Sequence, residues 1–207
     1  MPREIFEAVQ ARRRAELRSA LVGILPASEK QLILEIGCGN GHFLTAYASA
    51  HPEQLCIGID LRLERTDKAL RKRDRAGLSD LHFIRCEARN FLIALPVGVI
   101  LTDIYMLFPD PWPKKRHHKN RLLQTDFLSE LGARAGQGSR FFFRTDYQPY
   151  YDEARAIIAS HPQWRLLPDD SFPFEHVTIF QARAPVYHSL CARRSSPDPY
   201  NRTAPYE

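Results

Sequence analysis

The sequence contains few cysteines and no long apolar run, and these absences exclude several classes of protein. The four cysteines, Cys38, Cys56, Cys86 and Cys191, lie far apart and form no CxxC pair, so neither a zinc ribbon nor a thioredoxin-like site is indicated. No apolar run approaches the roughly 20 residues that span a bilayer. The N-terminal stretch carries charges throughout, unlike a signal peptide. We therefore expect a cytoplasmic protein with no metal and no membrane partner.

Length and charge indicate one mildly basic domain. A chain of 207 residues has room for one sizeable core and little room for a second. The 29 Lys and Arg against 24 Asp and Glu give a net charge of +5, which favours a polyanionic partner only weakly. Residues 3–25 are predicted to be helical, and five arginines make the extension 1–30 basic. These charges fit either an RNA-contacting arm or a solvated helix face.

Strand and helix patterns alternate along the rest of the chain. Strands are predicted at 31–37, 55–60, 81–87, 97–108, 140–146, 164–167 and 176–184, the last two as an antiparallel pair. Helices are predicted at 41–50, 62–77, 90–95, 120–136 and 148–161. This order predicts an α/β fold over residues 31–184, with a mostly parallel sheet and helices on both faces. A Pro-rich tail, 185–207, follows, either irregular or strapped onto the body.

The stretch LEIGCGNG indicates a nucleotide-type crevice after the first strand. It places Gly37, Gly39 and Gly41 at a strand-to-helix turn, where glycines let the backbone turn sharply and approach a ligand closely. In such sheets, ligands bind beyond the carboxyl ends of the strands. Asp60 ends the second strand about 20 residues on, and its carboxylate suits paired ribose hydroxyls.

The glycine spacing and two glutamates favour S-adenosylmethionine over a dinucleotide. The spacing is G-x-G-x-G, whereas a pyrophosphate is seated by G-x-G-x-x-G. Glu35 lies inside an otherwise apolar strand, where a buried acid is costly without a partner. It suits the cationic ammonium end of S-adenosylmethionine, although pairing with a structural Arg or backbone donors is the alternative. Glu87, at the end of the third strand, fits an acceptor for the adenine amino group.

The segment 108–121, FPDPWPKKRHHKNR, joins a rigid loop to a cationic run. Three prolines in five residues preorganise the loop. The ring of Trp112 can stack on a base while Asp110 accepts N–H bonds from its Watson–Crick edge. Five Lys or Arg and two His then follow within eight residues and match a phosphate backbone. The alternative is a surface turn with a solvated charge run.

The end of the fifth strand, FFFRTD, repeats this arrangement. Arg144 and Asp146 stand at the strand end, directly before a predicted helix. Asp146 is therefore either a substrate contact or only a helix N-cap.

These motifs together resemble a known family. LEIGCGNG, GIDLR, FPDPWPKKRH, FRTD and VTIFQ are similar to the motifs of bacterial tRNA (guanine-N7-)-methyltransferases of the TrmB type, from about residue 30 to 184. The resemblance implies a Rossmann-like class I methyltransferase that methylates guanine N7 in the tRNA variable loop. It also implies S-adenosylmethionine as cofactor and tRNA as partner.

The resemblance assigns roles to particular residues. It implies that Glu35, Asp60, Glu87 and Asp110 lie on the cofactor side, with Asp110 also catalytic. It also implies contacts to the substrate and the RNA. Together with the aromatic and cationic side chains beside them, the candidate substrate-binding residues are Trp112, Lys114, Arg116, His117, Lys119, Arg121, Asp146, Thr178 and Gln181. Two positions depart from the family pattern: Gln181 replaces the acid of T-x-[FY]-E, and Asn120 replaces a basic residue. Gln keeps hydrogen-bonding capacity but loses the charge.

Three other functions remain open from the residues. The PDPW turn loosely resembles the [DN]PP[YFW] loop of enzymes that methylate exocyclic amines, so a base amine or a protein amide is a possible acceptor. A catalytically weakened RNA-binding homologue is a second alternative, supported only by Gln181. A dehydrogenase is disfavoured by the glycine spacing and by Glu35.

Overall fold

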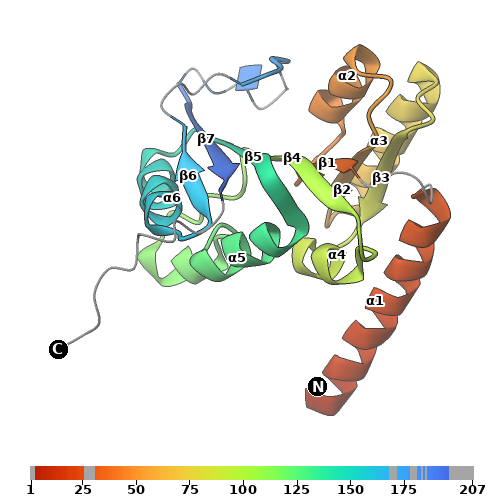
Figure 1. Cartoon of the computed structure of the whole chain (residues 1–207), viewed down its shortest axis with the longest axis horizontal. Coiled ribbons are helices and arrows are strands. Elements are labelled where there is room, and N and C mark those ends of the chain that lie inside the picture. The colour runs from red at the N-terminus through yellow and green to blue at the C-terminus, as the bar shows by residue number, and fades with distance from the viewer. Residues whose placement is uncertain are drawn as a thin grey trace.

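The computed structural model describes residues 3–25, 31–167, 172–177, 181–182, 184 and 186–195 (Figure 1). The strands are β1 (Gln31–Ile36), β2 (Cys56–Asp60), β3 (Leu81–Arg85), β4 (Ile100–Leu107), β5 (Ala135–Thr145), β6 (Trp164–Leu166) and β7 (His188–Arg194). The helices are α1 (Arg3–Ile24), α2 (His42–Ala50), α3 (Leu63–Ala76), α4 (Ala88–Ala94), α5 (Thr125–Arg134), α6 (Gln148–Ser160) and the short 3₁₀ helix η1 (Lys115–Asn120).

The strands form one sheet in the order β3-β2-β1-β4-β5-β7-β6. Strands β1 to β5 are parallel, and β7 runs antiparallel between β5 and β6. The chain winds outward in one direction from β1 to β3 and then restarts at β4 on the other side of β1. Such a reversal leaves a crevice at the carboxyl ends of the two central strands. The predicted α/β fold, with its late antiparallel pair, is confirmed.

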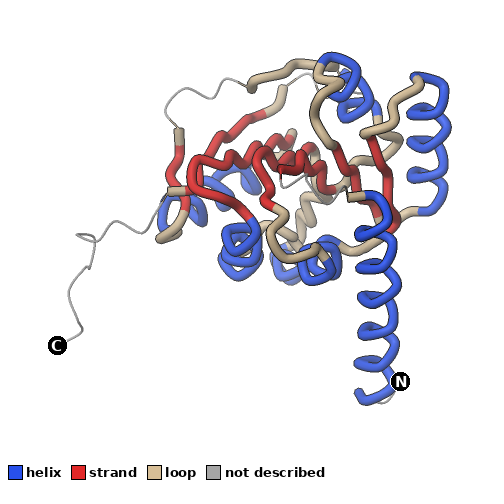
Figure 2. Tube along the Cα trace, turned by 45° about the vertical axis from the view of Figure 1, so that its right-hand side comes forward, coloured by secondary structure: helices blue, strands red, loops and turns tan. Residues whose placement is uncertain are grey.

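Helices cover both faces of the sheet (Figures 1 and 2). On one face, side chains of α1, α4, α5 and α6, among them Leu21, Phe91, Phe127 and Tyr150, form a core with the strands. On the other face, α2 and α3 pack with the segment 172–177 around a second, strongly aromatic core. The central strands are buried over nearly their whole length, as their uninterrupted apolar runs predict.

The last strand does not lie where the sequence predicts it. Residues 176 and 177 are not in a strand, residues 181–182 are helical, and residues 178–180 lie outside the described part. The partner of β6 is instead β7, within the segment expected to be a Pro-rich tail. The predicted strand is therefore wrong for the described residues of 176–184, and an irregular conformation is wrong for residues 188–194. The run HSLCARR mixes polar and apolar residues, so its pairing is decided by contacts with β5 and β6 rather than by local pattern.

Helix α1 confirms the predicted N-terminal helix and leans on α4 (Figure 1). Leu17, Leu21 and Leu25 are buried against the body, and Gln10 accepts a hydrogen bond from Asn90 Nδ2 at 3.0 Å. Among the described residues, no helix is long and apolar enough to cross a membrane.

Candidate active site

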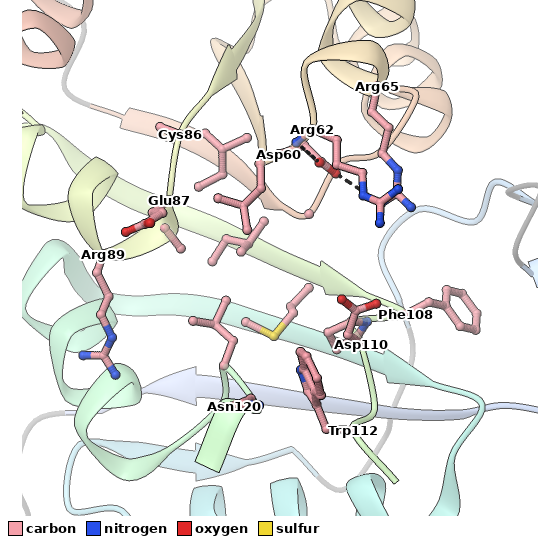
Figure 3. A pocket seen from close by; sticks show the side chains of 18 residues that line it. Asp60, Arg62, Arg65, Cys86, Glu87, Arg89, Phe108, Asp110, Trp112 and Asn120 are labelled. Carbon is pink, nitrogen blue, oxygen red and sulfur yellow. Dashed lines mark hydrogen bonds and ion pairs between the residues drawn. The ribbon is translucent and has the colours of Figure 1, made fainter. Parts of the chain in front are cut away.

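A cavity of about 400 Å³ opens at the carboxyl ends of β1, β2 and β4 (Figure 3). Its lining includes Gly37, Asp60, Glu87, Asp110 and Trp112, five residues that the sequence singles out. Figure 3 shows Glu87 on one side of the cavity, and Asp110 with Trp112 on the other. The cavity therefore has an end built by β2 and β3 and an end built by the loop after β4.

The glycine turn leaves space for a ligand on one side and packs tightly on the other. Gly37 and Gly39 have φ values of 76° and 54°, and a Cβ added at either would meet no atom within 4 Å. Gly41, with φ 69°, is different, because a Cβ there would lie 2.6 Å from Phe83 Cζ and 2.8 Å from Ala69 Cβ. At Gly37 and Gly39 the absence of a side chain therefore leaves the backbone accessible to a ligand. At Gly41 it allows the turn to pack closely against α3 and β3.

Asp60 ties the glycine turn to the second strand. Its Oδ2 accepts a hydrogen bond from Gly39 N at 3.0 Å, and its Oδ1 accepts one from Arg62 N at 2.8 Å. Arg65 Nη1 lies 3.6 Å from the same carboxylate (Figure 3). Each carboxylate oxygen has a further lone pair, so Asp60 can still accept from a ligand hydroxyl. Arg65 was missed by sequence reasoning, since a helical arginine among many gives no signal of its own.

Glu35 lies behind the glycine turn and does not line the cavity. One carboxyl oxygen accepts the backbone N–H of Leu44 in the first turn of α2, and Oε2 is buried without a hydrogen-bond partner among the described residues. Burial raises the pKa of Glu35 to about 8. The backbone-donor alternative is therefore supported for one oxygen. A direct contact to the cofactor ammonium remains a prediction.

Glu87 stands between β3 and α4 at the far end of the cavity. Its Oε2 accepts a hydrogen bond from Asn90 Nδ2 at 3.1 Å, and its side chain is otherwise exposed. A second cavity, also of about 400 Å³, shares Leu61, Cys86 and Glu87 with the first and is bordered by Arg13 of α1. Helix α1 therefore walls the Glu87 end of the site.

The loop after β4 adopts an unusual backbone. Phe108 and Trp112 have φ values of 51° and 44°, which cost non-glycine residues roughly 1–2 kcal/mol each. Phe108 N donates to Arg144 O at 2.7 Å, which extends the β4–β5 ladder into the loop. Asp110 is exposed, and Trp112 keeps 36% of its surface accessible. An acid and an indole are thus held at the mouth of the cavity, as predicted from the PDPW turn.

The cationic run beyond the loop forms η1, and most of it faces solvent. Lys114, Arg116 and Lys119 are exposed, as an RNA contact requires, and the His117 ring lies edge-on to Trp112 with centroids 5.8 Å apart. Arg121 is the exception, with only 2% of its surface exposed. This burial was not predicted, and it disfavours the predicted RNA contact, because the guanidinium is engaged inside the protein.

Two of the three remaining predicted substrate residues, Asp146 and Gln181, are described by the structure. Asp146 is exposed at the end of β5, and Thr178 lies outside the described residues. Gln181 is buried, and its Nε2 donates to Tyr187 Oη at 3.0 Å. Tyr187 also lies edge-on to Phe108, with ring centroids 6.0 Å apart, so Gln181 is linked to the PDPW loop through one side chain.

Arg144 holds the segment 172–177 against this side of the site. Its Nη1 and Nη2 donate to Glu175 at 3.1 and 2.7 Å, and its guanidinium lies 3.9 Å from the ring centroid of Phe172. The sequence places Arg144 at the strand end but does not reveal this clamp, since Glu175 is 31 residues away.

The strand order and the arrangement of helices around the sheet are those of class I methyltransferases. A family described as "Putative methyltransferase" matches residues 29–184. The chain belongs to this family and, within it, to the tRNA (guanine-N7-)-methyltransferases. The family predicted from the sequence motifs is thereby confirmed.

Two curated relatives and one solved structure illustrate the likeness. The tRNA (guanine-N(7)-)-methyltransferase of Nitrosococcus oceani is 33% identical over 156 residues, which are 75% of this chain and 66% of that protein. The protein of the same name from Synechococcus sp. strain JA-2-3B'a(2-13) is 35% identical over 78% of this chain and 71% of its own length. The structure of TrmN from Thermus thermophilus aligns with a TM-score of 0.57, 21% identity, and coverage of 86% and 48%.

Proposed function

We propose that the protein transfers a methyl group from S-adenosylmethionine to N7 of a guanine in the variable loop of tRNA. The observation that carries the proposal is the composition of one cavity. Its glycine turn and Asp60 border a nucleotide-sized space, and Asp110 and Trp112 stand at its mouth beside exposed cations. The relatives that share the motifs are named for this activity.

The residues present fit the cofactor. Bare backbone at Gly37 and Gly39 leaves room for its methionine part, and Asp60 retains lone pairs for ribose hydroxyls. Glu87 has an exposed carboxylate suited to the adenine amino group. When bound, S-adenosylmethionine supplies an electrophilic methyl group on a sulfonium. The four cysteines form no disulfide, which agrees with a reducing cytoplasm as the place of action.

The chain's own part in the reaction is alignment. Guanine N7 carries a lone pair and no proton at neutral pH, so it needs no general base. We assign Trp112 to stacking on the guanine and Asp110 to accepting its N1–H and N2–H groups, which would turn N7 toward the cavity. Lys114, Arg116 and Lys119 would hold the phosphate backbone.

The test is incubation of the protein with S-adenosylmethionine and unmodified tRNA, followed by mass spectrometry of the nucleosides. We expect 7-methylguanosine as the methylated product. A methylated exocyclic amine would instead identify the [DN]PP[YFW]-like chemistry. Binding of S-adenosylmethionine and tRNA without any transfer would identify an RNA-binding homologue without catalysis. Either result would overturn the proposal.

A further inference from the structure

Arg121 differs from every exposed cation in its segment. Its side chain is fully buried, whereas Lys114, Arg116 and Lys119 of the same run face solvent. Burying a guanidinium is costly unless it is paired and hydrogen-bonded. The partners of Arg121 therefore show what this cation does.

The contacts of Arg121 join the PDPW loop to α6. Arg121 Nε donates to the carbonyl oxygen of Pro111 at 2.9 Å, and Nη1 forms an ion pair and hydrogen bond with Glu153 Oε2 of α6. The guanidinium lies against two rings of the same helix region, 4.8 Å from the Tyr150 centroid and 5.8 Å from the Tyr147 centroid. A planar fork of donors suits this double contact, and a lysine ammonium does not.

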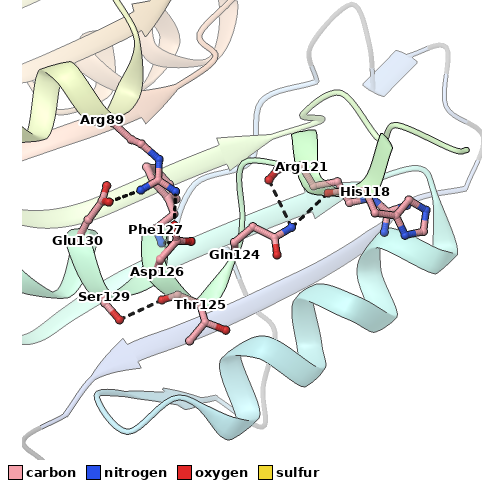
Figure 4. Close-up of polar contacts among 9 residues, drawn as sticks. All are labelled: Arg89, His118, Arg121, Gln124, Thr125, Asp126, Phe127, Ser129 and Glu130. Atoms are coloured by element: carbon pink, nitrogen blue, oxygen red, sulfur yellow. Dashed lines mark hydrogen bonds and ion pairs between the residues drawn. The ribbon is translucent and has the colours of Figure 1, made fainter. Parts of the chain in front are cut away.

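The backbone around Arg121 is fixed as well. Gln124 Nε2 donates to His118 O at 3.3 Å and to Arg121 O at 3.4 Å, which closes the end of η1 onto the start of α5 (Figure 4). Leu123 N donates to Tyr150 Oη at 3.2 Å. These hydrogen bonds fix the backbone at Arg121 against α5 and α6. The hydrogen bond from Arg121 to Pro111 therefore connects the PDPW loop to both helices.

The loop needs such a hold. Its entry is fixed by the bond from Phe108 N to Arg144 O, and Pro111 lies between Asp110 and Trp112, the two side chains at the cavity mouth. Trp112 has a left-handed backbone that a non-glycine residue keeps only where its surroundings impose it. The carbonyl of Pro111 immediately precedes that residue, so a bond to it restrains the strained position directly.

We infer that Arg121, together with Glu153, is a positioning residue that holds Asp110 and Trp112 in their reactive arrangement, and that it is not a contact to RNA. The inference rests on the proposed function only for its catalytic consequence. The loop-holding role itself belongs to the protein without substrate.

The first test compares Arg121→Lys with Lys119→Gln. Arg121→Lys keeps the positive charge but cannot serve Pro111 and Glu153 together, so we expect kcat to fall about tenfold or more while the tRNA Kd stays within about threefold. Lys119→Gln removes an exposed charge two residues away, and should raise the tRNA Kd and reduce its salt dependence. If Arg121→Lys keeps wild-type kcat while Arg121→Gln loses tRNA affinity, Arg121 is an RNA contact and the inference is wrong.

Glu153→Gln provides a second, independent test of the positioning role. An acid on α6 cannot favour RNA binding by its charge, so an RNA-contact role for Arg121 predicts unchanged or tighter tRNA binding and normal kcat. The positioning role predicts that Glu153→Gln lowers kcat about as much as Arg121→Lys does. It also predicts that the double variant, Arg121→Lys with Glu153→Gln, loses no more kcat than the more impaired of the two single variants. Wild-type kcat in Glu153→Gln would contradict the pairing.

A readout without activity separates this inference from the proposed function. Trp112 is partly exposed and Trp164, the other tryptophan, is fully buried, so acrylamide quenching reports mainly on Trp112. We expect stronger quenching in Arg121→Lys and Glu153→Gln than in the wild type or Lys119→Gln, with melting curves confirming that each variant is folded. Unchanged quenching would overturn the positioning role. If the wild type transfers no methyl group to tRNA, the proposed function fails, and the quenching result still decides the role of Arg121.

Discussion

At the scale of single residues, the ionisation of Glu35 makes the stability of the folded protein depend on pH. Its carboxyl group is buried, with a pKa raised from 4.5 to about 8 by desolvation, while the N–H of Leu44 opposes the shift. The unfolded chain releases this proton near pH 4.5 and the folded protein near pH 8. The stability that this group contributes is therefore fully present below pH 4.5 and is lost as pH rises to about 8.

Glu35→Gln tests this dependence. Gln resembles the neutral acid and does not ionise, so the variant should lose less stability than the wild type between pH 5 and pH 8, by on the order of 2–4 kcal/mol. Urea denaturation of the ligand-free proteins at the two pH values measures the difference. An identical loss in both proteins would show that Glu35 does not titrate in this way.

Asp110 carries the substrate side of the proposal. It is exposed at the cavity mouth, so its removal leaves the core intact. Asp110→Ala should reduce methyl transfer by about 100-fold or more through loss of guanine orientation, while the affinity for S-adenosylhomocysteine changes little. Asp80→Ala is the control, because Asp80 is an exposed acid directly before β3. It therefore lies at the amino-terminal ends of the strands, whereas the cavity lies at their carboxyl ends. Wild-type turnover in Asp110→Ala would rule out this role.

At the scale of elements, the turn between β1 and α2 separates ligand space from packing. Gly41→Ala would place a Cβ 2.6 Å from Phe83, so we expect a loss of about 2–4 kcal/mol in unfolding free energy. Gly37→Ala meets no neighbour and should cost about 1 kcal/mol from its positive φ alone, yet weaken cofactor binding strongly. Thermal melts and calorimetry with S-adenosylhomocysteine compare the pair. Equal losses of stability would contradict the assigned roles of the two glycines.

The same scale shows what the sequence can predict. Strands β1, β2 and β4 and the second half of β5 are largely apolar runs with both faces buried, so local pattern is enough to find them. Strand β7 is mixed in character and was missed, since its place depends on the edge that β5 offers. The burial of Arg121 was missed for a similar reason. A run of cations does not reveal which member is buried, and its partner Glu153 is 32 residues away.

At the scale of the whole molecule, β7 completes the sheet. It pairs with β5 through six residue pairs and with β6 on its other side, and Leu190, Cys191 and Ala192 are almost fully buried. Ending the chain at residue 187 would expose the edge of β5 and part of the core. We expect such a protein to lose cooperative unfolding in a thermal scan. Removal of residues 1–8 is the control, because the described side chains at 5, 7 and 8 are exposed, and it should leave a cooperative transition.

In the proposed reaction, S-adenosylmethionine bound by the glycine turn and Asp60 methylates a guanine that is held by Asp110 and Trp112. The most direct measurement is transfer of labelled methyl from S-adenosylmethionine to two unmodified tRNAs that differ only in the variable-loop guanine. Label should enter the tRNA that has the guanine, as 7-methylguanosine, and should be absent from the tRNA in which adenine replaces it. Equal labelling of both tRNAs, or labelling of neither while cofactor and tRNA bind, would contradict the account.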